Sequence, residues 1–149
     1  MPVILTQHFS PSDRAYEDAE FSLYHFPRVY FSRIRPYDRF IYYRPLGKSR
    51  ARVDSKHYFG HGILGQWYED VRRSDHRFVD LIKGERFAVL VPLVDERGLY
   101  YETESERPPQ GQAAVRDISE TAYYRILAAA AVRSAALSFL PSTEALLDV

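Results

Sequence analysis

The sequence predicts an α+β fold in which a small β-barrel is flanked by helices. Segments rich in aromatic and β-branched residues recur at short intervals and are separated by turns that contain glycine or proline. A segment with helical spacing follows them near residue 120. The 149 residues are 46% apolar, which is enough to bury a core, so we expect one domain over residues 1–149.

The first part of the chain predicts a turn or helix start, a strand and a short helix. Residues 10–13 contain the serine and aspartate types that cap helices. Residues 21–24 alternate as a strand does, and the proline at position 27 favours extended backbone just before it. Residues 28–35 predict a short helix. Its inward residues would be Val29, Tyr30 and Ile34.

Residues 40–43 predict the next strand, because side chains two positions apart share a face. One face would carry Phe40 and Tyr42, and the other Ile41 and Tyr43. Apolar periodicity is lost over residues 44–56, which contain a proline and a glycine, so we expect an exposed loop there.

Residues 58–65 resume the strand pattern, which Trp67 and Tyr68 extend as far as a polar bend. Gly60 and Gly62 lie at alternate positions within this strand. A glycine inside a strand marks either a bend or a close approach by another backbone or a ligand, and the sequence leaves both open.

Residues 78–82 and 87–94 predict two further strands, joined by a glycine-containing turn over residues 83–86. A turn over residues 95–98 is expected next, followed by a short strand or extended segment over residues 99–102.

A helix is expected to begin at Ser119, whose side chain can cap it. The helical pattern extends as far as Leu140 and the proline after it, and a second short helix would begin near residue 142. Residues 133–149 would thus form a C-terminal helical tail, which covers the barrel or contacts another chain.

Composition narrows the classes of function. The chain has no cysteine, which excludes thiolate catalysis and thiolate zinc sites. No phosphate loop, dinucleotide glycine pattern or nucleophile elbow is present, so we expect neither an enzyme nor a cofactor. We expect no metal site either, because the four-residue spacing of His57 and His61 in a strand does not bring both to one ion. We see no secretory signal or membrane-spanning segment and expect a cytoplasmic protein.

Charge is unevenly distributed along a chain whose formal net charge is zero. Residues 28–56 carry seven arginines and two lysines against two aspartates. This tract predicts a surface that contacts phosphates, although a solvated loop with interspersed arginines is the alternative. The expected phosphate contacts are Arg28, Arg44, Lys48, Arg50, Arg52 and Lys56.

Aromatic residues flank this basic tract and would supply stacking surface for bases, with packing in the barrel core as the alternative. The candidates for stacking are Tyr24, Phe26, Tyr43 and Trp67. His25 and His61 would hydrogen-bond a base edge or a phosphate, or serve as structural histidines. Gly60 would let a ligand approach the backbone. These residue types together predict nucleic-acid binding.

Four short motifs carry a resemblance to a known family. They are Tyr24-His25-Phe26-Pro27, the run from Asp38 to Arg44, the run from Tyr58 to Gly65, and Ala114-Val115-Arg116-Asp117-Ile118-Ser119 before a helix. With these motifs the chain resembles the EVE-like members of the PUA-like superfamily, over roughly residues 20–132. Such modules occur beside HNH-type and other nucleases in bacterial modification-dependent restriction systems.

The resemblance implies a PUA-like barrel that reads DNA and flips a modified base, such as a modified cytosine, into a pocket with aromatic walls. The chain carries no nuclease domain, so cutting would fall to a partner or to a further domain. Two alternatives remain open: an RNA-binding PUA-like module, and a barrel that binds a protein or a small molecule. An interior filled by the protein's own side chains, with the loop over residues 44–56 pointing away, would favour the last of these.

Overall fold

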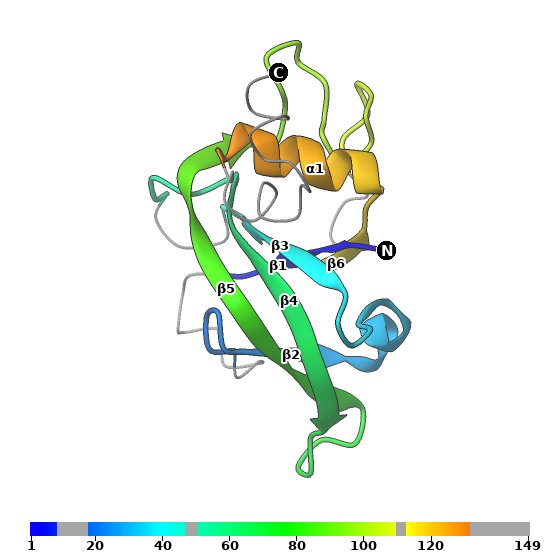
Figure 1. Ribbon diagram of the computed structural model, residues 1–149. Helices are drawn as coiled ribbons and strands as arrows, with labels where there is room; N and C mark the ends of the chain where they lie inside the picture. Colours follow the sequence, from blue (N-terminus) through cyan, green and yellow to red (C-terminus); the bar gives the residue numbers. More distant parts are fainter. Residues whose placement is uncertain (9–17, 47–50, 110–112, 132–149) are drawn as a thin grey trace, which may run out of the picture.

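The computed structural model describes residues 1–8, 18–46, 51–109 and 113–131, and shows a strongly curled sheet with one α-helix against its outer face (Figure 1). Its elements are β1 (Val3–Thr6), β2 (Leu23–Pro27), the 3-10 helix η1 (Arg28–Arg33), β3 (Arg39–Arg44), β4 (His57–Glu69), β5 (His76–Pro92), β6 (Val115–Asp117) and α1 (Glu120–Ala129).

The six strands form one sheet in the order β2-β5-β4-β3-β1-β6, which curls into a half-barrel. The β1–β3 pair is parallel, and the other pairs are antiparallel. The expected combination of a small curved sheet and a helix is therefore present. The helix expected near residues 10–13 lies outside the described residues, as does the tail over residues 133–149.

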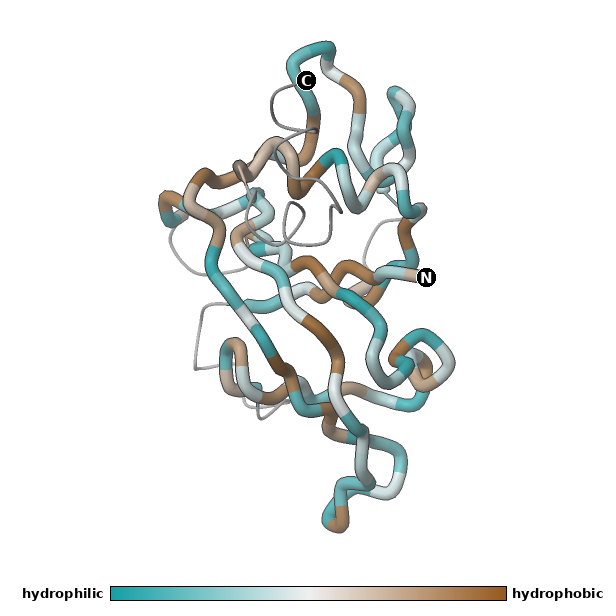
Figure 2. Tube along the Cα trace, viewed as in Figure 1, coloured by the Kyte–Doolittle hydropathy of each residue, from teal (hydrophilic) through white to brown (hydrophobic). Residues whose placement is uncertain are grey.

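Period-two alternation divides the apolar residues between two cores, as predicted for residues 40–43. Phe40 and Tyr42 point into the half-barrel, where they join an inner core built from β1, β2, β4 and β5. Ile41 and the half-buried Tyr43 point the other way, into an outer core that α1 covers. In Figure 2 hydrophobic positions gather on the central strands and on α1.

Several predicted elements are confirmed, and others differ for identifiable reasons. The long strand β4 and the bend after it agree with the sequence. The turn expected over residues 83–86 is wrong, because β5 runs through it as a single strand that pairs with the equally continuous β4. Lys83 accommodates the irregularity with a φ of 53°. The strand expected over residues 99–102 is a turn with isolated bridges.

The helix after the strands begins as predicted and ends earlier. Ser119 is its N-cap, with Oγ accepting a hydrogen bond from the Ala122 amide at 3.0 Å. The last residue of α1 is Ala129, and Ala131 takes a left-handed φ of 60°, so the continuous helix to Leu140 is wrong. Ile34, which follows the last residue of η1, is buried as predicted. Val29 within η1 is 69% exposed, so the prediction that it points inward is wrong.

Candidate nucleic-acid interface

Tyr24 and Phe26, two of the predicted base-stacking residues, lie in the inner core. Only 4% of Tyr24 and 1% of Phe26 are exposed, and the rings stack on one another with centroids 6.5 Å apart. The Tyr24 hydroxyl donates to the carbonyl of Thr6 at 3.0 Å. In this structure, then, the interior of the half-barrel is filled by the protein's own side chains, and neither ring faces an external ligand.

His25 points out of the half-barrel and is buried by its neighbours. Its Nε2 lies 2.9 Å from Asp70 Oδ2, and its ring stacks on Phe78 at 4.3 Å. Burial lowers the pKa of His25 below its ordinary value even though Asp70 favours the charged form. A neutral, packed ring with a carboxylate partner holds the end of β2 against the β4–β5 hairpin, so the structural alternative fits His25.

Tyr43 and His61 lie on the outer face of the sheet, away from Tyr24 and Phe26. Tyr43 packs on Tyr58 with centroids 5.5 Å apart. His61 is 7% exposed, with Nε2 3.1 Å from Glu85 Oε1 and its ring stacked on Phe87. The residues predicted to line one base pocket therefore lie on two faces of the sheet and do not converge.

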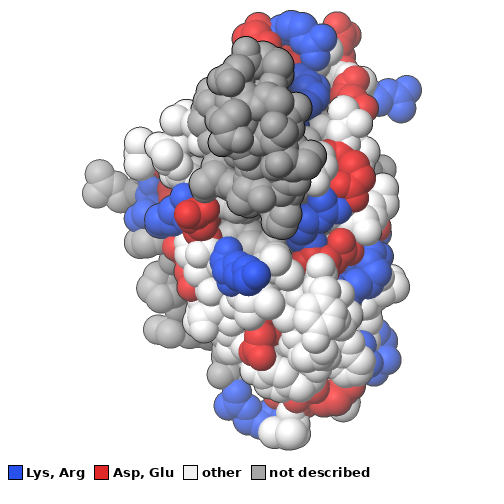
Figure 3. Space-filling view, viewed as in Figure 1, with Lys and Arg blue, Asp and Glu red and all other residues white. Residues whose placement is uncertain are grey.

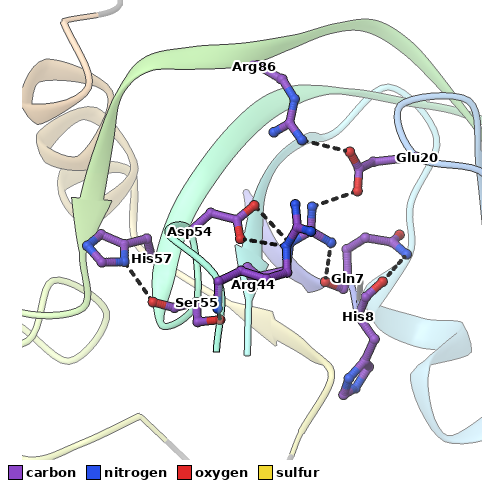
Figure 4. Close-up of polar contacts among 9 residues, drawn as sticks. Gln7, His8, Glu20, Arg44, Asp54, Ser55, His57 and Arg86 are labelled. Atoms are coloured by element: carbon purple, nitrogen blue, oxygen red, sulfur yellow. Dashed lines mark hydrogen bonds and ion pairs between the residues drawn. The ribbon is translucent and has the colours of Figure 1, made fainter. Parts of the chain in front are cut away.

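Arg44 differs most from its prediction, because it belongs to the end of β3 and not to an exposed loop. The side chain is 1% exposed and bonds Asp54 at 3.2 Å, Glu20 at 2.7 Å and the carbonyl of Gln7 at 3.0 Å (Figure 4). Its guanidinium also lies 4.0 Å from the centroid of the Phe59 ring. A guanidinium held by two carboxylates does not contact phosphates, so its assignment to backbone binding is corrected.

The other predicted phosphate contacts are dispersed. Arg52 pairs with Asp54 at 3.3 Å, while Lys56 and Arg28 are exposed. Lys48 and Arg50 lie outside the described residues. In Figure 3 positive and negative residues are interspersed over the described part of the visible face. On that face, the described residues form no continuous positive surface.

Trp67 lies near the end of β4, at the end of the half-barrel opposite α1 (Figure 1). The side chain is 37% exposed, and the Arg77 guanidinium lies 3.6 Å from its ring centroid. The same guanidinium is 3.9 Å from the ring of Phe31, over which the exposed Arg28 also lies at 5.3 Å. We call Arg28, Phe31, Trp67 and Arg77 the Trp67 cluster.

Arg77 and Phe31 were missed by reasoning from sequence. Arg77 pairs with Glu69 across the β4–β5 hairpin, and Arg77 Nε bonds Glu69 Oε2 at 3.1 Å. The polar bend after β4 was visible in the sequence, and folding it into a hairpin would have set Arg77 near Trp67. Phe31 reaches the cluster from η1, and no local pattern signals that contact.

The Trp67 cluster combines stacking surface with the exposed Arg28, whereas Arg77 is paired with Glu69. An exposed aromatic ring gives a base a stacking partner, and the exposed Arg28 of the same cluster attracts phosphate. Among the described residues, no group of three His, Asp or Glu side chains is placed to hold a metal ion.

Comparisons with family models, curated proteins and solved structures found no match to this chain. In the described parts of the chain, no helix has the length and apolar character needed to cross a bilayer.

Proposed function

We propose that this protein binds nucleic acid without acting on it chemically, and that an unpaired or extruded base stacks on Trp67. The observation that carries the proposal is the exposed Trp67 ring beside the Arg77 guanidinium, at the end of the half-barrel where Arg28 is also exposed. Stacking of a base on such a ring contributes about 1–3 kcal/mol, and Arg28 adds a salt-dependent phosphate contact.

The resemblance to EVE-like domains supports DNA with a modified base, such as a modified cytosine, as the first ligand to test. Extrusion of that base from a duplex costs about a few kcal/mol, which stacking on Trp67 would offset in part. Structured RNA is the alternative nucleic acid. A nuclease would be the partner that acts on the bound DNA.

A protein-binding or small-molecule-binding barrel is the second candidate. The filled inner core favours it, because Tyr24 and Phe26 pack against the protein's own side chains and do not line an open base pocket.

Binding of labelled oligonucleotides to Trp67→Ala tests the proposal. The set should hold matched plain and modified DNA duplexes, single strands and RNA. The variant should bind about 5- to 160-fold more weakly than the wild type, since that range corresponds to the loss of one stacked base. Tyr124→Ala is the matched control, because Tyr124 is 51% exposed on α1 at the other end of the fold and should leave affinity unchanged.

Arg28→Ala should weaken binding equally for all sequences and reduce the dependence of log affinity on log salt by about one phosphate contact. A wild-type protein that binds none of these nucleic acids at low salt would contradict the proposal. So would equal affinities for the wild type and Trp67→Ala.

A further inference from the structure

The Phe21 ring packs on the inner face of the sheet against two glycines, Gly60 of β4 and Gly84 of β5. A Cβ atom added to Gly60 of β4 would lie 2.6 Å from Phe21 Cζ, and one added to Gly84 of β5 would lie 2.7 Å from Phe21 Cδ1. Both separations are shorter than side chains tolerate, so the two glycines form a flat floor on which an aromatic ring rests.

The walls beside this floor are aromatic as well. The Phe21 ring meets Tyr42 edge-on with centroids 4.9 Å apart, and Phe59 at 6.2 Å. Tyr42 and Phe59 are fully buried and stack on one another, so they are rigidly held. We call the space bounded by Tyr42, Phe59, Gly60 and Gly84 the Phe21 slot.

Phe21 itself is held less securely than the slot it fills. It is partly exposed and its φ is 63°, a left-handed conformation that is unfavourable for a bulky residue. It lies in a tight turn closed by bonds from Ser22 and Leu23 to the carbonyl of Ala19. Its amide donates to the Tyr42 hydroxyl at 2.9 Å.

Polar groups border the slot. Arg86 lies over the rings of both Phe21 and Phe59, and its guanidinium bonds Glu20 at 3.2 Å. Arg44, also over Phe59, bonds Glu20 and the backbone of Gln7 (Figure 4).

We infer that the Phe21 slot is a binding site for a planar nitrogen heterocycle, and that Phe21 occupies it until the ligand ring displaces it. Such a ring matches the flat glycine floor and the aromatic walls. A ring N–H or amino group would replace the Phe21 amide as donor to the Tyr42 hydroxyl. Movement of the turn would also release Phe21 from its left-handed backbone. This inference goes beyond the proposed function, because the slot and the Trp67 cluster share no residue.

Titration of Phe21→Ala with free adenine, free cytosine and toluene tests it. The variant should bind adenine or cytosine at least about tenfold more tightly than the wild type, because no side chain competes for the slot. Phe21→Ala/Gly60→Ala is the matched control: its added methyl group stands on the floor and should abolish the gain. Equal binding by wild type and Phe21→Ala would overturn the inference. So would an unaffected double variant, or binding of toluene alone, which would indicate only a dry cavity.

If Phe21→Ala fails to fold, NMR relaxation dispersion on the wild type replaces it. The Phe21 amide should exchange between two states, and adenine or cytosine should raise the population of the minor one; absence of both effects would overturn the inference. If an oligonucleotide competes with the free base for binding to Phe21→Ala, the natural ligand ring belongs to a nucleic acid. If it does not compete, the natural ligand is a free small molecule. Trp67→Ala in the same background should leave binding of the free base unchanged, which separates this result from failure of the proposed function.

Discussion

Arg44→Met tests whether the buried guanidinium organises the end of β3. The side chains of Arg44 and Asp54 are 1% and 6% exposed, whereas that of Glu20 is 32% exposed and also bonds Arg86. Removing one partner of a buried ion pair costs about 3–5 kcal/mol. Because Arg52 still bonds Asp54, we expect the lower part of that range, about 3 kcal/mol of unfolding free energy, or about 10 °C in Tm for a chain of this size.

Urea unfolding followed by circular dichroism measures the effect. Arg52→Met is the matched control, since the Arg52 side chain is 35% exposed and contacts the same carboxylate. This change should lower the unfolding free energy by less than about 1 kcal/mol. Arg44→Met/Asp54→Asn should recover part of the loss, because no uncompensated charge is left buried.

The pH dependence gives a second check on Arg44. Arg44 and Arg52 hold the pKa of Asp54 below its ordinary value in spite of burial, so the stability that this carboxylate contributes is present above about pH 4 and is lost as pH falls through the lowered pKa. Without Arg44 the burial penalty raises that pKa. The difference in unfolding free energy between the wild type and Arg44→Met should therefore become smaller as the pH falls from about 7 to about 4. If Arg44→Met lowers the unfolding free energy by less than about 1 kcal/mol at every pH, Arg44 is solvated, as the sequence alone suggested.

Two further predictions concern α1 and β2. Ser119→Ala removes the N-cap of α1 and should cost about 1 kcal/mol in urea unfolding. Thr121→Ala at an exposed helix position should leave stability unchanged or raise it by a few tenths of a kcal/mol, because alanine is the better helix former; equal effects of the two changes would contradict the cap. Burial lowers the pKa of His25, so the unfolded chain takes up the proton first and stability should fall as pH drops below about 6.5. His25→Gln should flatten that fall in urea titrations from about pH 7 to pH 5, and an unchanged slope would mean that folding does not shift the pKa of His25.

Local patterns predicted the elements whose cause is local. The alternation over residues 40–43 sorted side chains between the two cores, and Ser119 marked the first turn of α1. A glycine between polar residues is typical of a turn, so the local pattern predicts one over residues 83–86. Pairing with β4 keeps β5 continuous there instead.

The candidate site was predicted only in part. The sequence predicts Trp67 as a stacking candidate where a strand enters a polar bend, with core packing as the alternative, and the structure leaves it partly exposed. The loss of apolar periodicity, with Pro45 and Gly47, predicts a loop that begins at Arg44, yet Glu20 and Asp54 approach Arg44 from other segments and bury it. Sequence neighbours carry no information on such partners.

By itself the sequence determined that this chain forms a curved sheet with a capped helix, and that rings and cations are concentrated between β2 and β4. Period, turn chemistry and capping act over a few residues, so they can be read along the chain. Only the tertiary structure decided which rings fill the core and which reach the surface. Tyr24 is buried and Trp67 exposed because strand register and sheet curvature bring distant segments together, and the same curvature sets Phe21 on Gly60 and Gly84.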